Sequence, residues 1–199
     1  MMKKYLAECI GTFALSFIVV LAVASPSTPI PIPVIAGITL ALFVYSIGPI
    51  SGCHINPSVT LGQLSVKKIS FKDAVFYVIA QCFGVLFTIL LVKFLQIQTL
   101  SASVAFSNKI FIAEILGSFF FNFGLASVVY GKAKGQVSGI VVGGSLFLGV
   151  MVASFGGALG ILNPAVAIAL NSLTVVYLFA PMIGSVIGFW VYAYLVSER

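Results

Sequence analysis

A seven-residue pattern occurs twice in this chain, about half its length apart. Residues 7–13 read AECIGTF and residues 113–119 read AEILGSF, which places Glu8 and Glu114 106 positions apart. An Asn-Pro pair is repeated at nearly the same distance, with Asn56 in the first half and Asn163 in the second. Self-similarity at a fixed spacing indicates two structurally equivalent units. We expect repeat 1 to cover about 1–95 and repeat 2 about 109–199, within a single domain 1–199.

Long apolar segments fill both units and identify the solvent as lipid. Hydrophobic residues make up 61% of the chain and charged residues only 7%, which excludes a soluble protein. A helix needs about 20 apolar residues to cross a bilayer. Six segments fit, at about 5–24, 33–48, 71–95, 109–130, 137–155 and 175–196. The sequence therefore predicts an all-α membrane protein with six transmembrane helices, anchored in a lipid bilayer.

The basic residues give the orientation of these helices. Eight of them fall on one side of the alternating spans, namely Lys3, Lys4, Lys67, Lys68, Lys72, Lys132, Lys134 and Arg199. Only Lys93 and Lys109 fall on the other side. Cytoplasmic loops carry the excess of lysine and arginine, so both termini are expected in the cytoplasm. The net charge of +6 is therefore a topology signal, and no nucleic acid partner is expected.

Two further segments, 50–66 and 156–173, are too apolar for solvated loops and too short to cross the membrane. Each contains one of the Asn-Pro pairs. Asparagine is a strong N-cap and proline is tolerated at the first helical position, so Asn56-Pro57 and Asn163-Pro164 predict two helix starts. Three spans per unit force the second unit to enter the membrane from the opposite side. The result is an inverted 3+3 repeat with two re-entrant half-helices that meet near the midplane.

Non-helical backbone at that depth must be buried in protein or line a watery cavity, so loops 51–55 and 158–162 are expected to line a pore. Their carbonyl groups would accept hydrogen bonds, and the amides of Asn56 and Asn163 would donate them. The positive ends of the two half-helices would disfavour cations. This combination favours small neutral solutes.

At these positions the chain resembles the aquaporins and aquaglyceroporins, the major intrinsic protein family. Residues 51–60, SGCHINPSVT, resemble the first signature of that family, with Ser58 where alanine is usual. The triplet Asn163-Pro164-Ala165 resembles the second. The resemblance implies a passive channel for water and small neutral solutes, without a cofactor and assembled as a homotetramer. It also implies that Glu8 and Glu114 hold the backbone of the pore loops, although an intramembrane carboxylate could instead serve a proton relay.

The same resemblance implies an outer selectivity filter of four residues. Counting along the signatures places it at Ala36, Met151, Gly160 and Val166, where most relatives have an arginine at the last position. A filter without charged or aromatic side chains would be wide and apolar. In this respect the chain is closer to the plant vacuolar channels, which also pass urea, ammonia or hydrogen peroxide. The filter positions do not decide whether glycerol is also a permeant.

The pore loops contribute five more expected residues, which are Gly52, Cys53, His54, Leu159 and Ile161. His54, the only histidine, is expected to pack beside the pore, with a pH gate as the alternative. The three cysteines form no CxxC pair, and the chain has no catalytic constellation, so neither an enzyme nor a metal site is predicted.

Two alternatives to an open channel follow from the sequence. Secondary transporters also use inverted repeats and broken helices, but they place substrate or ion-coupling groups at the midplane. An occluded or gated membrane protein is conceivable because Leu159, Ile161 and Met151 are bulky and near the outer mouth. The compact sequence is typical of a prokaryotic plasma-membrane protein.

Overall fold

Six long helices account for most of the protein. The computed structural model describes residues 2–25, 27, 29–98, 106–133 and 135–197. The long helices are α1 (Met2–Ala24), α2 (Ile32–Ser51), α4 (Phe71–Phe94), α5 (Asn108–Val129), α6 (Ser138–Phe155) and α8 (Val175–Val196). Each is long and apolar enough to cross a membrane, counting the short turn η1 (Gly135–Val137) with α6. The six predicted spans are confirmed, with bounds that differ by at most three residues.

Two short helices begin at the Asn-Pro pairs. They are α3 (Pro57–Ser65) and α7 (Pro164–Ala169). Asn56 and Asn163 have extended backbones, and the side-chain oxygen of each accepts a hydrogen bond from the N–H two residues further on. Each asparagine thereby satisfies a donor that the first helical turn leaves open. The two half-helices start where the sequence predicted.

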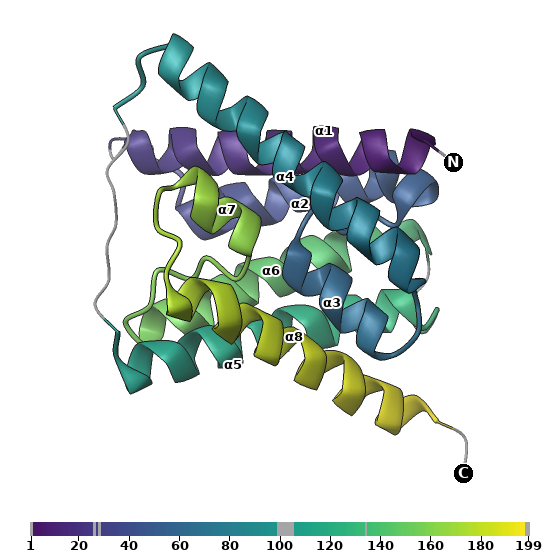
Figure 1. The fold of residues 1–199 in the computed structure, drawn as a ribbon. Coiled ribbons are helices and arrows are strands. Elements are labelled where there is room, and N and C mark those ends of the chain that lie inside the picture. The colour runs from purple at the N-terminus through teal and green to yellow at the C-terminus, as the bar shows by residue number, and fades with distance from the viewer. Residues whose placement is uncertain (1, 26, 28, 99–105, 134, 198–199) are drawn as a thin grey trace.

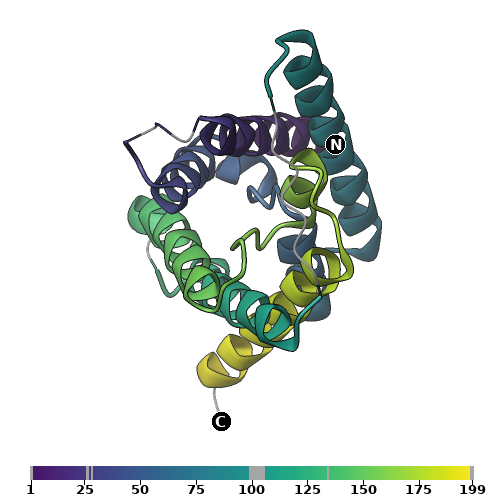
Figure 2. The same ribbon diagram turned by 90° about the vertical axis from the view of Figure 1, so that its left-hand side faces the viewer.

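The long helices form a ring, and the two pore loops lie inside it (Figure 2). In repeat 1, α1 packs against α2 and α4, and in repeat 2, α5 packs in the same way against α6 and α8. The repeats meet through α2 and α6, and through each half-helix and the last long helix of the other repeat. The half-helices approach the centre from opposite ends of the bundle (Figure 1). This is the inverted arrangement that the repeat predicted.

Both ends of the described chain lie at the same end of the bundle (Figure 1). The alternation of the helices brings the segments that carry Lys67, Lys72 and Lys132 to this end, and the opposite end carries Lys93 and Lys109. Lys134 and Arg199, which also entered the topology prediction, lie outside the described residues.

Small residues allow equivalent helices to cross closely in both repeats. A Cβ atom on Gly84 of α4 would lie 2.5 Å from the carbonyl oxygen of Cys9 on α1. A Cβ atom on Gly184 of α8 would collide in the same way with the carbonyl of Ile115 on α5. Backbone atoms cannot yield as a flexible side chain can, so these crossings require glycine.

We expect Gly84→Val to destabilise the protein by separating α4 from α1. Overpacking of this kind costs about 1–3 kcal/mol. Gly144→Val on α6 is the matched control, because a Cβ atom there meets nothing within 4 Å. Thermal unfolding in one detergent should give a lower midpoint for Gly84→Val only. Equal midpoints for the two variants would contradict the close crossing.

Candidate pore and selectivity site

The first pore loop is held by Glu8, whose side chain is completely buried. One carboxylate oxygen accepts hydrogen bonds from the Ser51 hydroxyl (2.7 Å) and the His54 N–H (2.9 Å). The other accepts from the Ile55 N–H (2.6 Å) and from Nε2 of Gln81 (2.9 Å). Four donors therefore converge on one carboxylate, and two of them are main-chain groups next to Asn56.

The second pore loop has an equivalent but simpler attachment. The two carboxylate oxygens of Glu114 accept the N–H groups of Ile161 (3.0 Å) and Leu162 (3.1 Å). Within the described part of the chain, the hydrogen-bonded side chains that surround Glu8 have no counterpart around Glu114. Neither carboxylate takes part in an ion pair among the described residues, where the pair found joins Lys4 and Asp73.

Two tyrosines support the same loops, and the sequence reasoning missed both. The Tyr77 hydroxyl donates to the carbonyl of Ser51 at 2.6 Å, and its ring lies edge-on to His54. The Tyr177 hydroxyl accepts the N–H of Leu159 at 3.2 Å. These tyrosines lie 100 positions apart, the same spacing as Gly84 and Gly184. An alignment of the last helix of each repeat would have paired these two tyrosines, but it would not have shown that they bind the loops.

The two Asn-Pro pairs connect the repeats at the centre of the bundle. Nδ2 of Asn56 donates to the carbonyl of Leu162 (3.0 Å), and Nδ2 of Asn163 donates to the carbonyl of Ile55 (3.0 Å). Since an amide nitrogen carries two hydrogens, each asparagine keeps one for another acceptor. The centre therefore holds two oriented amide donors.

Each loop reaches this geometry through strained backbone immediately before its asparagine. Ile55 has φ 39° and Leu162 has φ 52°, both in the left-handed region. That region is unfavourable for a β-branched residue such as isoleucine, and such strain costs about 1–3 kcal/mol per residue. The bonds from Glu8 and Glu114 act on these same residues, so the carboxylates stabilise a loop conformation that the local sequence disfavours.

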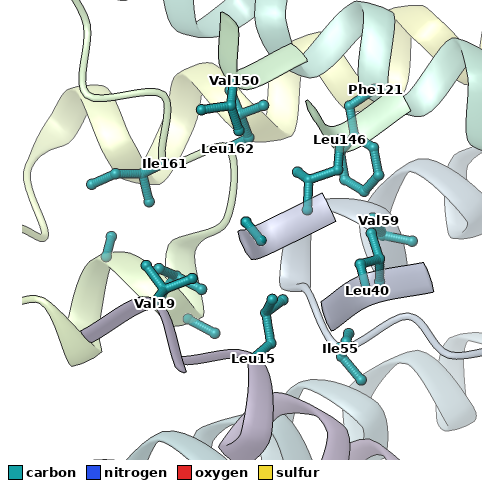
Figure 3. Packing of buried hydrophobic residues seen from close by; sticks show 14 of the residues in the cluster. Leu15, Val19, Leu40, Ile55, Val59, Phe121, Leu146, Val150, Ile161 and Leu162 are labelled. Atoms are coloured by element: carbon teal, nitrogen blue, oxygen red, sulfur yellow. The ribbon is translucent and has the colours of Figure 1, made fainter. Parts of the chain in front are cut away.

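A cavity of about 310 Å³ is lined by both pore loops and by side chains of α1, α2, α5, α6 and α7. Figure 3 shows Leu15, Val19, Leu40, Leu146 and Val150 from three of these helices around a common space. The wall is mainly apolar. Its polar side chains are His54 and Asn56 from the first loop region, Asn163 from the second, and Ser154 from α6.

Three of the four expected filter residues, Ala36, Gly160 and Val166, line this cavity together. The fourth, Met151, is not part of this cavity wall, to which α6 contributes Val150 and Ser154 as well as Leu146. Residues four apart share one face of a helix, and the next residue along points about 100° away. Counting back from Asn163 gives only a distance along the sequence. The rotation of α6 about its own axis decides which of its side chains face the cavity.

The other expected site residues fall into two groups. His54, Leu159 and Ile161 belong to the cavity wall. The remaining residues lie outside that wall and are Gly52, Cys53, Pro57, Ser58, Pro164 and Ala165. The Cys53 side chain is only 2% exposed. The His54 ring is buried, and its Nδ1 lies 3.1 Å from the Thr60 hydroxyl, so it is fixed beside the pore.

Taken together, inverted helical repeats around a central cavity, with two capped half-helices meeting inside it, define a membrane channel. The chain matches the model of the major intrinsic protein family over residues 1–192, and it belongs to that family. It is accordingly a channel for water or small neutral solutes and not an enzyme. Among the described residues there is also no group of three or more His, Cys, Asp or Glu side chains that could hold a metal ion.

Full-length relatives support this assignment. Aquaporin AqpM of Methanothermobacter thermautotrophicus is 31% identical, and the match covers 98% of both chains. Glycerol uptake facilitator protein-like 6 of Lactiplantibacillus plantarum is 32% identical over 94% of this chain and 95% of its own. Among solved structures, the aquaglyceroporin from Plasmodium falciparum matches with a TM-score of 0.75, covering 98% of this chain and 94% of that one. At 18% identity, that likeness shows the fold alone.

Proposed function

We propose that this channel conducts small neutral solutes such as urea and glycerol as well as water, and that its outer constriction lacks charge. The observation that carries the proposal is the composition of the cavity wall. Ala36, Gly160 and Val166 meet there with Val150, and no charged side chain is present in the described wall. A wall of small aliphatic groups leaves room for solutes larger than water.

Each permeant loses hydration when it enters the cavity. An ion that enters an apolar cavity gives up its hydration and finds no opposite charge, which is very costly. A small neutral solute gives up fewer hydrogen bonds and recovers some from the loop carbonyls and from the free N–H groups of Asn56 and Asn163. The support of both loops by Glu8 and Glu114 would keep these groups in place.

Stopped-flow light scattering on proteoliposomes tests the proposal. We expect shrinkage under a non-permeant osmolyte to be faster than in empty liposomes, and urea and glycerol gradients to give re-swelling that empty liposomes lack. Flux of water alone would overturn the broad selectivity. Permeabilities equal to those of empty liposomes would favour an occluded state.

We further infer that residues 1–199 form one channel unit, with repeats at about 1–95 and 109–199, whose termini face the cytoplasm of a prokaryotic cell. The unequal distribution of lysines between the two ends of the bundle supports this orientation. Family membership supports assembly as a homotetramer. Accessibility of a cysteine introduced at Ser197 in intact cells tests the orientation, and native mass spectrometry tests the assembly.

A further inference from the structure

Ser154 is the one hydroxyl-bearing residue in the described wall of the cavity. It lies one helical turn beyond Val150 on α6, close to the end of that helix. A Cβ atom on Gly160 would lie 3.3 Å from the Ser154 hydroxyl oxygen and 2.8 Å from a Val150 methyl. Ser154 therefore lies at the same level as the second pore loop. Neither residue count nor family signature pointed to it.

The hydroxyl of Ser154 is available to a solute. It forms none of the side-chain hydrogen bonds found among the described residues, and the residue is exposed at the cavity. Serines on the same helix behave differently, since the hydroxyl of Ser145 donates to the carbonyl of Val141 at 2.6 Å. A serine that leaves this bond unmade keeps both its donor and its acceptors free.

The neighbouring loop supplies acceptors but few donors. The N–H groups of Leu159, Ile161 and Leu162 are bound by Tyr177 and Glu114. What this loop can offer to a solute is therefore mainly its carbonyl oxygens. The other polar side chains of the described wall, those of His54, Asn56 and Asn163, belong to the centre of the bundle, where the two Asn-Pro pairs meet.

We propose that Ser154 is a specificity-determining residue of the outer constriction, favouring neutral solutes that carry both hydrogen-bond donors and an exposed oxygen acceptor. This inference rests on the proposed function. A urea or glycerol molecule there donates to the loop carbonyls, and Ser154 donates to its oxygen, while Val150 and Val166 contact the rest of the molecule. The hydroxyl replaces a water that the solute must shed on the apolar side.

The isosteric pair Ser154→Thr and Ser154→Val separates hydrogen bonding from width, because the two side chains have the same shape and only threonine keeps the hydroxyl. We expect Ser154→Val to lower the urea-to-water and glycerol-to-water permeability ratios about two- to tenfold relative to Ser154→Thr, the range of one neutral hydrogen bond. Ser145→Val, on the same helix but outside the cavity wall, is the control for the substitution itself.

The ratios come from stopped-flow measurements on proteoliposomes that contain equal amounts of each variant. Equal ratios for Ser154→Thr and Ser154→Val, in vesicles whose wild-type protein conducts urea and glycerol, would overturn the role of Ser154 and leave the proposed function intact. A wild-type protein that conducts neither solute would overturn both. A lower ratio in Ser154→Val alone supports the assignment.

Discussion

Replacing Val166 by arginine is expected to lower urea and glycerol permeability by about tenfold or more while water conduction persists. Val166 lines the cavity together with Ala36 and Gly160, and its side chain is 4% exposed. Arginine adds a long side chain with five N–H donors at this point. It would occupy space in a cavity of about 310 Å³ that solutes larger than water need. A tenfold effect requires only about 1.4 kcal/mol of additional barrier.

The matched control is Val166→Met, which adds length without charge. If bulk alone closes the constriction, Val166→Met and Val166→Arg will reduce urea flux equally. Water gives up hydrogen bonds to other water molecules when it enters the constriction. If the N–H donors of arginine replace these bonds, only Val166→Arg will retain fast water flow. Parallel stopped-flow measurements of water, urea and glycerol distinguish the two cases. Unchanged solute flux in Val166→Arg would contradict the placement of Val166 at the narrow point.

Much of this architecture could be predicted because it depends on signals that lie close together in sequence. Apolar runs long enough to cross a bilayer gave the six spans, and asparagine before proline gave the starts of α3 and α7. The repeated AExxG pattern located Glu8 and Glu114, and the family resemblance implied that these two carboxylates bind the pore loops, as the structure shows. Each of these features has a local physical cause.

The features that the sequence did not reveal depend on the relative placement of elements. A residue count gave Met151 as a filter position, and only the rotation of α6 in the folded protein shows that Val150 and Ser154 line the cavity. The contributions of Tyr77 and Tyr177 appear only once the last helix of each repeat is packed behind a loop. The left-handed backbone of Ile55 also could not be predicted, since isoleucine disfavours that conformation.

The two repeats hold their loops unequally, and this difference predicts unequal responses to the same substitution. Glu8 accepts from two main-chain N–H groups, the Ser51 hydroxyl and Gln81. Glu114 accepts from two main-chain N–H groups, and its other described surroundings add no side-chain donor. A glutamine side chain has one acceptor oxygen and one NH₂ group, so it can satisfy donors on one side only.

We therefore expect Glu8→Gln to destabilise the protein more than Glu114→Gln. In Glu8→Gln, two of the four donors would face an NH₂ group, and each buried donor left without an acceptor costs about 1–3 kcal/mol. In Glu114→Gln, one donor of two loses its acceptor. Where the new NH₂ group faces Ile55 or Leu162, the change also releases that strained residue from the bond that holds it next to its asparagine.

Thermal unfolding in a single detergent, together with water permeability per reconstituted protein, measures both consequences of these substitutions. Glu8→Gln should have the lower midpoint and the larger loss of permeability, because its loop is held by more bonds to the altered group. A proton relay would add a separate effect, since either glutamine would then also remove proton movement across the vesicle membrane. A midpoint for Glu114→Gln at or below that of Glu8→Gln would show that the side-chain donors around Glu8 contribute little. Packing of the side chain would then have to keep Ile55 in its strained conformation. The Ile55 side chain packs against Gly11 on α1, and this contact could supply that support.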